Sequence, residues 1–418
     1  MIASIVKGAL YGLGVRRKGT LDGLSRVVAS ALGHADYPSV VSAQIHEHAM
    51  TVAKVPAKKF FFDGKTAVET IYWVSKWYGI DIPMSFTDVY NYEAEALGAK
   101  MIYSGHSMPT IDFREPLIKK AEDLDKIKTP IKADWGRIPY VIDQIRWNAK
   151  ISGSAPIAIF CSPFSLAVGL RSYPALIRDM RSRPEFAHKL FTWIVDEVHV
   201  PYLQLLKKET GAKIAMGADA WACYPNLSLD MIDKWVVPYA KRLRKACAKK
   251  GIIALAGAAA GDYCEEDPEK FDIEIMKKCW SMAVRAISGI DLNIGMPLMG
   301  MGRTQDWSLE ALREYRHKNK IPIFGLLPTI TNINARFIRE GPPEKIVDYV
   351  KRLVDLFARD GRMLFMFVQI PALTPPEHVH TAIAALKTYG RYPIAENLDT
   401  VTFEKPVFEP FEEWVKKQ

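Results

Sequence analysis

Residues 44 to 50 have the sequence QIHEHAM, in which His46 and His48 flank Glu47 just after the apolar run PSVVSAQI. If a β-strand extends through this run to His48, its side chains alternate between two faces, so that Gln44, His46 and His48 share one face. Two imidazoles on one face can hold a metal ion or move a proton. The structural alternative is a pair of hydrogen-bonded polar residues at the end of a strand.

Eight short apolar runs recur along the chain, most of them separated by stretches with helical periodicity. They lie at residues 39–45, 81–87, 156–162, 213–219, 251–257, 289–295, 321–327 and 363–371. Near-continuous apolar strands that alternate with amphipathic helices are typical of a buried parallel sheet. Eight such units predict an α/β fold, the (β/α)8 TIM barrel.

We predict a single barrel domain over residues 1–418, because no Ser/Gly-rich linker or repeat divides the chain. The wide interval between the second and third runs predicts an insertion after strand 2. Residues 1–38 are predicted to form an N-terminal helical extension, and residues 393–418 a Pro-rich C-terminal tail, since both lie outside the eight-unit pattern.

In barrels of this kind the chemistry takes place at the C-terminal ends of the strands. Residues with polar, aromatic or soft side chains follow several of the predicted strands: Gln44, His46, His48, Asp88, Tyr90, Glu93, Asp219, Trp221, Tyr224, Asp262, Cys264, Met296, Met299 and Arg303. We therefore expect them to line one mouth of the barrel.

Each of these residues also has a structural interpretation. Asp88 and Asp219 can cap the helices that follow their strands. Trp221 and Tyr224 can close the barrel rather than contact a substrate, and Cys264 can be an ordinary thiol. The Met-rich turn at residues 296–301 can serve packing alone.

The composition is that of an ordinary soluble globular protein, with 418 residues, 49% hydrophobic and 25% charged. The net charge of +9 suggests an acidic ligand or partner, but the densest basic run, residues 241–250, is predicted to be a solvated helix face. Five scattered cysteines without a CxxC pair predict reduced thiols. The sequence contains no secretory signal and no run of the roughly 20 apolar residues that a membrane span needs. We expect a cytoplasmic protein without nucleic-acid or membrane partners.

Four segments, residues 86–101, 161–191, 209–243 and 372–392, together resemble the uroporphyrinogen decarboxylase superfamily. They begin FTDVYNYEAEALGAKM, CSPFSLAVGLRSYPALIRDM, ETGAKIAMGADAWACYPNL and ALTPPEHVHTAIAALK, and they occur in the order that the family has them. The superfamily also contains methyltransferases that exchange methyl groups with corrinoid proteins. The resemblance implies a barrel enzyme, and its branches differ in their site residues.

The decarboxylase branch holds pyrrole NH groups with an aspartate after the second strand, and Asp88 in FTD matches it. The chain departs from that branch elsewhere. QIHEHAM contains no arginine, and the expected tyrosine and histidine fall near Val168 and Val368. The zinc-dependent thiol-methylating branch expects His-x-Cys after the fifth strand, where the chain has ALAGAAAGDYCEED and Cys264 lies a few residues past that place.

The remaining branch takes a methyl group from an aryl methyl ether or a methylamine and gives it to the cob(I)alamin of a separate corrinoid protein. The resemblance thus implies a methyltransferase whose cobalamin is supplied by a corrinoid-binding partner, and a homodimer stays open. Its rivals are a decarboxylase of a porphyrinogen or another carboxylic acid, and a non-catalytic corrinoid- or tetrapyrrole-binding protein.

In this interpretation an acid or a metal ion activates the leaving group. We expect His46, His48, Asp88 and Asp219 to be catalytic. The expected substrate-binding residues are Gln44, Tyr90, Trp221, Tyr224, Met296, Met299 and Arg303. If a zinc ion is bound, its expected ligands come from His46, His48, Glu93, Asp262 and Cys264.

Overall fold

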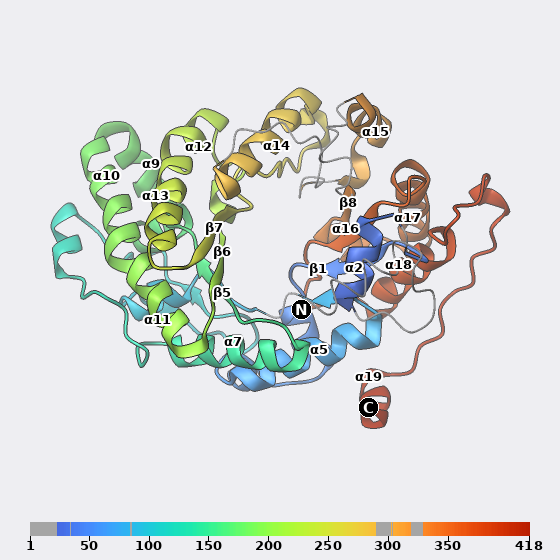
Figure 1. The fold of residues 1–418 in the computed structure, drawn as a ribbon, viewed down its shortest axis with the longest axis horizontal. Coiled ribbons are helices and arrows are strands. Elements are labelled where there is room, and N and C mark those ends of the chain that lie inside the picture. Colours follow the sequence, from blue (N-terminus) through green and yellow to red (C-terminus); the bar gives the residue numbers. More distant parts are fainter. Residues whose placement is uncertain (1–22, 34, 84–85, 290–301, 303, 319–328) are drawn as a thin grey trace.

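The computed structural model describes residues 23–33, 35–83, 86–289, 302, 304–318 and 329–418. Its strands are β1 (Ser39–Ser42), β2 (Ile82–Pro83), β3 (Met101–Ile102), β4 (Thr110–Ile111), β5 (Ile157–Cys161), β6 (Ile214–Ala218), β7 (Ile253–Ala258), β8 (Thr329–Ile333) and β9 (Met363–Phe367). Two groups of parallel strands, ordered β2-β1-β9-β8 and β5-β6-β7, form the barrel wall. Figure 1 shows β5, β6 and β7 facing β1 and β8 across the centre of the molecule.

Helices surround these strands. They are α2 (Gly23–Ala31), α3 (His46–Val52), α4 (Ala57–Phe60), α5 (Gly64–Tyr78), α6 (Tyr92–Ala96), α7 (Ile138–Ser152), α8 (Pro163–Arg171), α9 (Tyr173–Ser182), α10 (Pro184–Trp193), α11 (Val200–Thr210), α12 (Leu229–Trp235), α13 (Val237–Ala248), α14 (Ile273–Ser288), α15 (Leu309–Lys318), α16 (Ala335–Glu340), α17 (Pro343–Phe357), α18 (Pro376–Tyr389) and α19 (Phe411–Trp414). None of the helices in the described ranges has the length and apolarity that a bilayer span requires.

Helix ends follow local sequence signals. The side chain of Asp63 accepts a hydrogen bond from the amide of Thr66 at 3.1 Å and so caps the start of α5. The same helix ends at Gly79, whose φ of 82° is in the left-handed region that glycine adopts at little cost. Such signals made the alternation of strand and helix predictable.

The predicted (β/α)8 TIM barrel is confirmed, with helix α2 in the N-terminal extension and an insertion between β2 and β5 that contains α6, the β3–β4 hairpin and α7. The runs at 290–295 and 321–327 lie outside the described residues. The strand β8 that pairs with β9 comes after the predicted seventh run, and this position was therefore missed. Its sequence TITNI alternates polar and apolar residues, so a search for continuous apolar runs passes over it.

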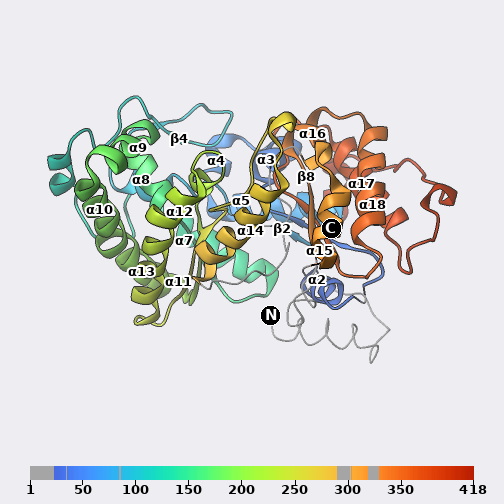
Figure 2. The same ribbon diagram turned by 90° about the horizontal axis from the view of Figure 1, so that it is seen from above.

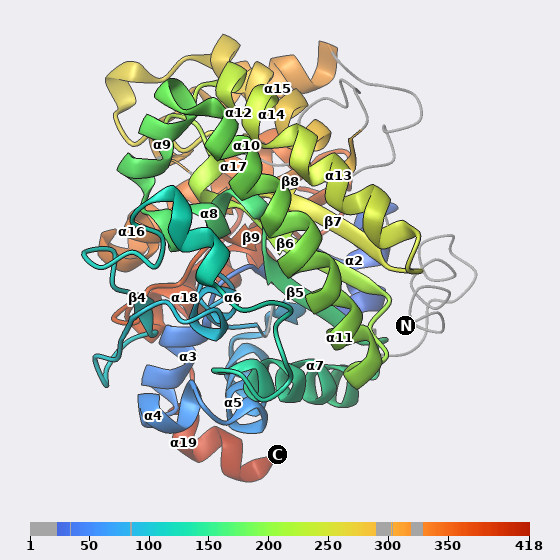
Figure 3. The same ribbon diagram turned by 90° about the vertical axis from the view of Figure 1, so that its left-hand side faces the viewer.

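The two ends of the barrel carry different elements. Figures 2 and 3 place the short helices α8 and α16 and strand β4 on one side of the barrel, with α2 on the opposite side. Helices α11 and α13 cover the outer face of β5, β6 and β7 (Figure 3). The side that carries α8 and α16 is the C-terminal end of the strands, where a barrel places its chemistry.

The prediction that His46 and His48 share the inner face of a strand is wrong. Strand β1 ends at Ser42, and α3 begins at His46. A helix forms because Ile45, Ala49 and Met50 bury their side chains at helical spacing. Residues two apart on a helix point in different directions, so the two imidazoles do not form one polar face.

His48 instead forms part of the core. It is fully buried, and its Nε2 lies 2.7 Å from the hydroxyl oxygen of Tyr78 on α5. Burial lowers the pKa of His48 to about 4, so its ring is neutral at pH 7 and is a poor proton donor. Burial also lowers the pKa of His46, whose Nδ1 has no hydrogen-bond partner among the described residues. A catalytic role for either histidine stays a prediction that lacks the geometry on which it was based.

Glu93 joins the inserted helix α6 to the end of β5. The described residues show no strand pairing between β2 and β5. At this place the fully buried Glu93 accepts a hydrogen bond through Oε1 from the backbone amide of Cys161, at 2.8 Å. Its Oε2 has no hydrogen-bond partner in the described chain, and burial raises the pKa of Glu93 to about 8. Glu93 therefore keeps its proton at neutral pH.

Replacing Glu93 with glutamine should change how stability depends on pH. Folded Glu93 holds its proton up to about pH 8, whereas the unfolded chain releases it near 4.5. The stability that this group contributes is therefore present below about pH 4.5 and is lost as the pH rises through about 8. Because glutamine does not titrate, the free energy of unfolding of Glu93→Gln relative to the unsubstituted protein should rise by roughly 2 to 4 kcal/mol between about pH 5 and about pH 9.

Urea unfolding followed by circular dichroism at both pH values measures this difference. Glu122→Gln is the matched control, because Glu122 is exposed in the short 3₁₀ helix η1 (Ala121–Lys126). It should leave the pH dependence unchanged. An identical pH dependence for Glu93→Gln and the unsubstituted protein would contradict the assignment.

Candidate functional site

The loops that follow β6 and β7 lie side by side at the C-terminal end of the barrel. Four backbone hydrogen bonds of 2.7–3.0 Å join them. The amide of Asp219 donates to Ala258, that of Gly261 to Ala222, that of Tyr224 to Asp262, and that of Cys264 to Tyr224. The two loops therefore bring Asp219 and Asp262 to the same part of the barrel mouth, as the strand-end position of both residues predicted.

Asp219 is held rigidly through one of its two carboxyl oxygens. Its Oδ1 accepts hydrogen bonds from the backbone amide of Ser165 at 2.8 Å and from the Ser165 hydroxyl at 2.7 Å, in the first turn of α8. The other oxygen, Oδ2, is buried and has no hydrogen-bond partner among the described residues. Burial raises the pKa of Asp219 to about 7, against the opposing effect of these bonds. The group can thus exchange a proton near neutral pH.

A close approach of side chains to β6 supports this arrangement. A Cβ atom at Gly217 would lie 2.4 Å from the hydroxyl oxygen of Ser162 and 2.5 Å from the ring of Phe160, so only glycine fits there. The same hydroxyl accepts a hydrogen bond from the amide of Gly257 at 2.9 Å. Ser162 therefore connects the ends of β5 and β7 across Gly217.

Asp262 is positioned by a tight turn after β7. Gly257, Ala259 and Gly261 all have positive φ, at 86°, 73° and 77°, which turns the chain back toward the strand end. Asp262 is 8% exposed, and its Oδ2 has no hydrogen-bond partner within the described ranges. Burial raises the pKa of Asp262 to about 7. A second carboxyl group thus titrates close to neutral pH.

Tyr90 comes from the loop after β2 and lies close to both carboxyl groups. A backbone group of Ala220 hydrogen-bonds its hydroxyl. Burial raises the pKa of Tyr90, and the nearby Cys161, Asp219 and Asp262 raise it further. Residues distant in sequence therefore meet here, as expected from their places after the predicted strands. The predicted roles differ: Asp219 was expected to be catalytic, Tyr90 to bind substrate and Asp262 to be a metal ligand.

Asp88 differs from these groups because it is paired. It forms an ion pair with Arg137, and its Oδ1 accepts a hydrogen bond from Asn91. Arg137, itself buried, also donates through Nε to Glu95 at 2.6 Å. Burial raises the pKa of Asp88 to about 7, and Arg137 opposes this shift. Both carboxyl oxygens of Asp88 are thus engaged by protein groups.

The sequence analysis did not identify two residues that hold these carboxyl groups. Ser165 fixes Asp219, and Arg137 pairs with Asp88. Ser165 is the third residue of α8, after the N-cap residue Ser162. The sequence carries no signal that links either residue to its partner, because both contacts span more than forty positions.

The expected metal ligands are not brought together. His48 bonds to Tyr78, and Glu93 bonds to the backbone of Cys161. Cys264 interacts with the thiol of Cys223. Within the described ranges, no group of three His, Cys, Asp or Glu side chains is spaced to hold a metal ion. The five cysteines are free thiols, as predicted.

The remaining predicted substrate-binding residues lie in different parts of the structure. Trp221 stacks on Tyr173 with ring centroids 5.5 Å apart, and its edge meets Phe113 at 6.1 Å. Tyr224 stacks on Tyr263 at 5.6 Å. Gln44 lies beside the end of β9, since its carbonyl accepts from the amide of Ile370 at 2.8 Å. Met296, Met299 and Arg303 lie outside the described residues.

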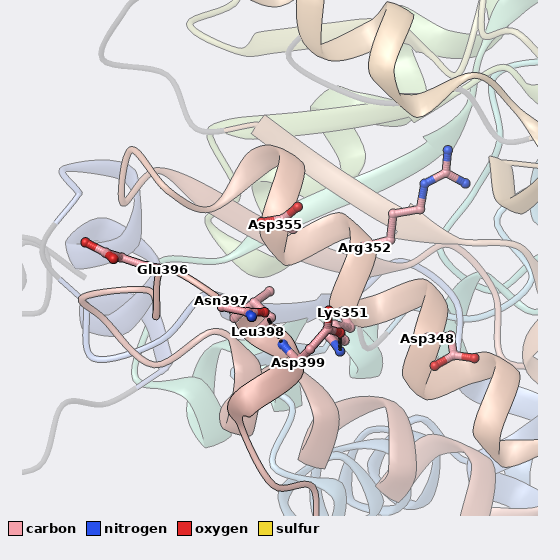
Figure 4. A pocket seen from close by; sticks show the side chains of 8 residues that line it. All are labelled: Asp348, Lys351, Arg352, Asp355, Glu396, Asn397, Leu398 and Asp399. Atoms are coloured by element: carbon pink, nitrogen blue, oxygen red, sulfur yellow. Dashed lines mark hydrogen bonds and ion pairs between the residues drawn. The ribbon is translucent and has the colours of Figure 1, made fainter.

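A pocket of about 390 Å³ lies away from this site, between α17 and the segment around residues 396–399 (Figure 4). Its cations are paired with acidic residues: Lys351 lies 2.5 Å from Asp399, and Arg352 lies 2.7 Å from Glu310. These pairs leave no cation or carboxylate of the four free for chemistry. We therefore place the candidate site at Asp219, Asp262 and Tyr90.

Comparisons with known proteins agree with the barrel. A solved structure of a methyltransferase from Methanosarcina mazei superposes with a TM-score of 0.62, covering 87% of this chain and 97% of that chain at 16% sequence identity. A uroporphyrinogen decarboxylase from Myxococcus xanthus (strain DK1622) is 30% identical over 182 residues, which are 42% of this chain. The chain spans about half the length of this curated relative, 49%.

The family assignment follows from a longer match. The family described as Uroporphyrinogen decarboxylase (URO-D) matches residues 34–389, a range that runs from just before β1 to the end of α18. The match includes the described barrel strands and the candidate site. The chain therefore belongs to the uroporphyrinogen decarboxylase family.

Proposed function

We propose that the protein is a methyltransferase that moves a methyl group from a small methylated substrate to the cob(I)alamin of a separate corrinoid protein. The observation that carries the proposal is the state of Asp219. One oxygen of this carboxyl group is fixed by Ser165, the other is buried and unpartnered among the described residues, and its pKa is raised to about 7. The similarity in fold to a methyltransferase from Methanosarcina mazei supports the proposal.

Methyl transfer from oxygen or nitrogen needs a site that manages charge on the departing atom. An aryl methyl ether needs a proton on the leaving oxygen as the C–O bond breaks. A methylated ammonium ion leaves as a neutral amine and needs a negative group to hold its charge before transfer. Asp219 and Asp262, which both titrate close to pH 7, can meet either need.

The electrostatics disfavour a porphyrinogen as the substrate. A substrate with several carboxylates needs cations in its site, yet Asp219 and Asp262 would present negative charge to it. Asp88, at the place where the decarboxylase branch binds pyrrole NH groups, has both oxygens engaged by Arg137 and Asn91. A tetrapyrrole would have to break a buried ion pair to bind there.

The corrinoid would be brought by the partner protein and would accept the methyl group. In this chain, Ser165 orients Asp219, and Asp219 and Asp262 hold or move a proton at their Oδ2 atoms. His48, whose ring is neutral and bonded to Tyr78, takes no part in these steps.

Methyl transfer can be measured directly. Purified protein is mixed with chemically reduced cobalamin and a panel of aryl methyl ethers, methylamines and quaternary ammonium compounds, while the cob(I)alamin absorbance is followed. We expect loss of the cob(I)alamin signal and formation of methylcobalamin with at least one donor. Release of carbon dioxide from a carboxylic acid, with no methyl transfer from any donor, would instead support a decarboxylase.

Substitution of Asp219 tests the residue on which the proposal depends. Asp219→Asn keeps the shape and the Oδ1 acceptor but cannot ionise, so we expect methyl transfer to fall by at least about tenfold. Ser165→Ala removes the hydroxyl that bonds to Asp219 but keeps the backbone amide, and it should cause a smaller loss. The matched control is Asp230→Asn, because Asp230 is exposed on α12. Unchanged transfer rates in Asp219→Asn would remove this residue from the mechanism.

A further inference from the structure

Among the described residues, no cation lies beside the two carboxyl groups after β6 and β7. Asp219 is fully buried, Asp262 is 8% exposed, and the Oδ2 atom of each lacks a hydrogen-bond partner in the same ranges. In the part of the chain that the structure describes, the titratable groups that interact with them are a phenol and four thiols: Tyr90, Cys161, Cys223, Cys264 and Cys279. None of these groups carries a positive charge.

An unpaired buried carboxylate is costly, so a protein either avoids it or compensates for it. Elsewhere in this barrel the compensation is internal, since Arg137 pairs with Asp88 and Glu95. Another buried carboxylate, Asp179, pairs with Arg171 at 2.8 Å. Asp219 and Asp262 have no such partner among the described residues, so a ligand that carries a positive charge would compensate them.

Aromatic residues also come from the loops at this end of the barrel. Tyr90 interacts with both carboxyl groups, and the backbone amide of Trp221 lies 3.3 Å from the Ser165 hydroxyl that bonds to Asp219. Trp221 belongs to an aromatic group with Tyr173 and Phe113. The faces of aromatic rings attract cations, and quaternary ammonium ions above all, because these ions have no N–H groups that require hydrogen-bond acceptors.

Size and donor chemistry favour an organic cation over a metal ion. A zinc site takes three or four protein ligands that lie close together. No group of three His, Cys, Asp or Glu residues in the described ranges is spaced for this purpose. Two carboxylate oxygens and aromatic rings suit a bulky, weakly hydrated cation instead.

We propose that the methyl donor is a methylated ammonium ion, bound at Asp219 and Asp262 with aromatic rings around its methyl groups. This inference rests on the proposed methyl transfer and names its substrate class. In the transfer, the C–N bond breaks and its electron pair stays on nitrogen, so a neutral amine leaves. The electron pair of the new bond to the methyl group comes from the Co(I) centre of the partner protein. No proton is consumed.

Calorimetric titration of the whole chain with choline, without any corrinoid, tests the inference. The matched uncharged probe is 3,3-dimethylbutan-1-ol, which has the shape of choline but carbon in place of nitrogen. We expect choline to bind at least about tenfold more tightly than the alcohol. Choline affinity should also rise by about tenfold from about pH 6 to about pH 8, because carboxyl groups with a pKa of about 7 ionise in this interval.

Proton release on binding and a substitution at Asp262 test the same pH dependence independently. At about pH 7, choline should release protons, so the binding heats in phosphate and in Tris should differ. Asp262→Asn should weaken choline binding by at least about fivefold, whereas Asp230→Asn on the exposed face of α12 should not. If Asp262→Asn does not fold, the unsubstituted protein still tests the inference. Its affinities for the two probes, and for choline at the two pH values, give the answer.

The outcomes separate this inference from the proposed function. Equal binding of the two probes, no binding, or weaker choline binding at higher pH would overturn the cationic substrate. If an aryl methyl ether still methylates cobalamin in that case, the proposed function stands without it. Choline binding with the expected pH dependence supports a cationic ligand. This holds even if no donor methylates cobalamin and the proposed function is therefore wrong.

Discussion

The free energy cost of burying a carboxyl group is the constraint that shapes the mouth of this barrel. Such a group must be paired, hydrogen-bonded or protonated, because an isolated charge is poorly tolerated in a low-dielectric interior. The structure uses each solution. Asp88 is paired with Arg137, Glu93 is protonated and bonded to the backbone of Cys161, and Asp219 is bonded to Ser165 through one oxygen. Among the described residues, Asp219 and Asp262 combine a raised pKa with an unpartnered oxygen at the ends of neighbouring strands. The proposed chemistry therefore lies where the electrostatic cost of burial is least compensated among the described residues.

Backbone geometry keeps those two groups in place. The loops after β6 and β7 are joined by hydrogen bonds between main-chain groups, which do not depend on side-chain rotamers. Gly217 allows Ser162 and Phe160 to approach β6 closely, and the tight turn that begins at Gly257 returns Asp262 to the strand end. A site built on strand ends and short loops is better preorganised than one on long loops. The backbone therefore holds each carboxyl group in its buried position at the strand end.

The sequence predicted the barrel well because strand and helix periods alternate so regularly. It also predicted the place of Tyr90, Asp219 and Asp262 after their strands, because barrels carry their site residues at strand ends. It failed at QIHEHAM, where an alternating pattern of seven residues fits a strand and a helix equally well. Burial of Ile45 against the core decided for the helix, which is a tertiary effect. The partners Ser165 and Arg137 were missed for the same reason, since nothing local in the chain shows which distant carboxyl group each will meet.

The charge of the whole chain and the charge of its site have opposite signs, and this difference is informative. The net charge is +9, which at long range would repel a cation and attract an acidic protein. Salt screens that long-range field within about 8 Å at physiological ionic strength, whereas buried charges are screened much less. A small cation that enters the mouth therefore meets mainly the local field of Asp219 and Asp262. The net charge of the chain is therefore a poor guide to the charge that its buried carboxyl groups would attract, because the two fields act over different distances.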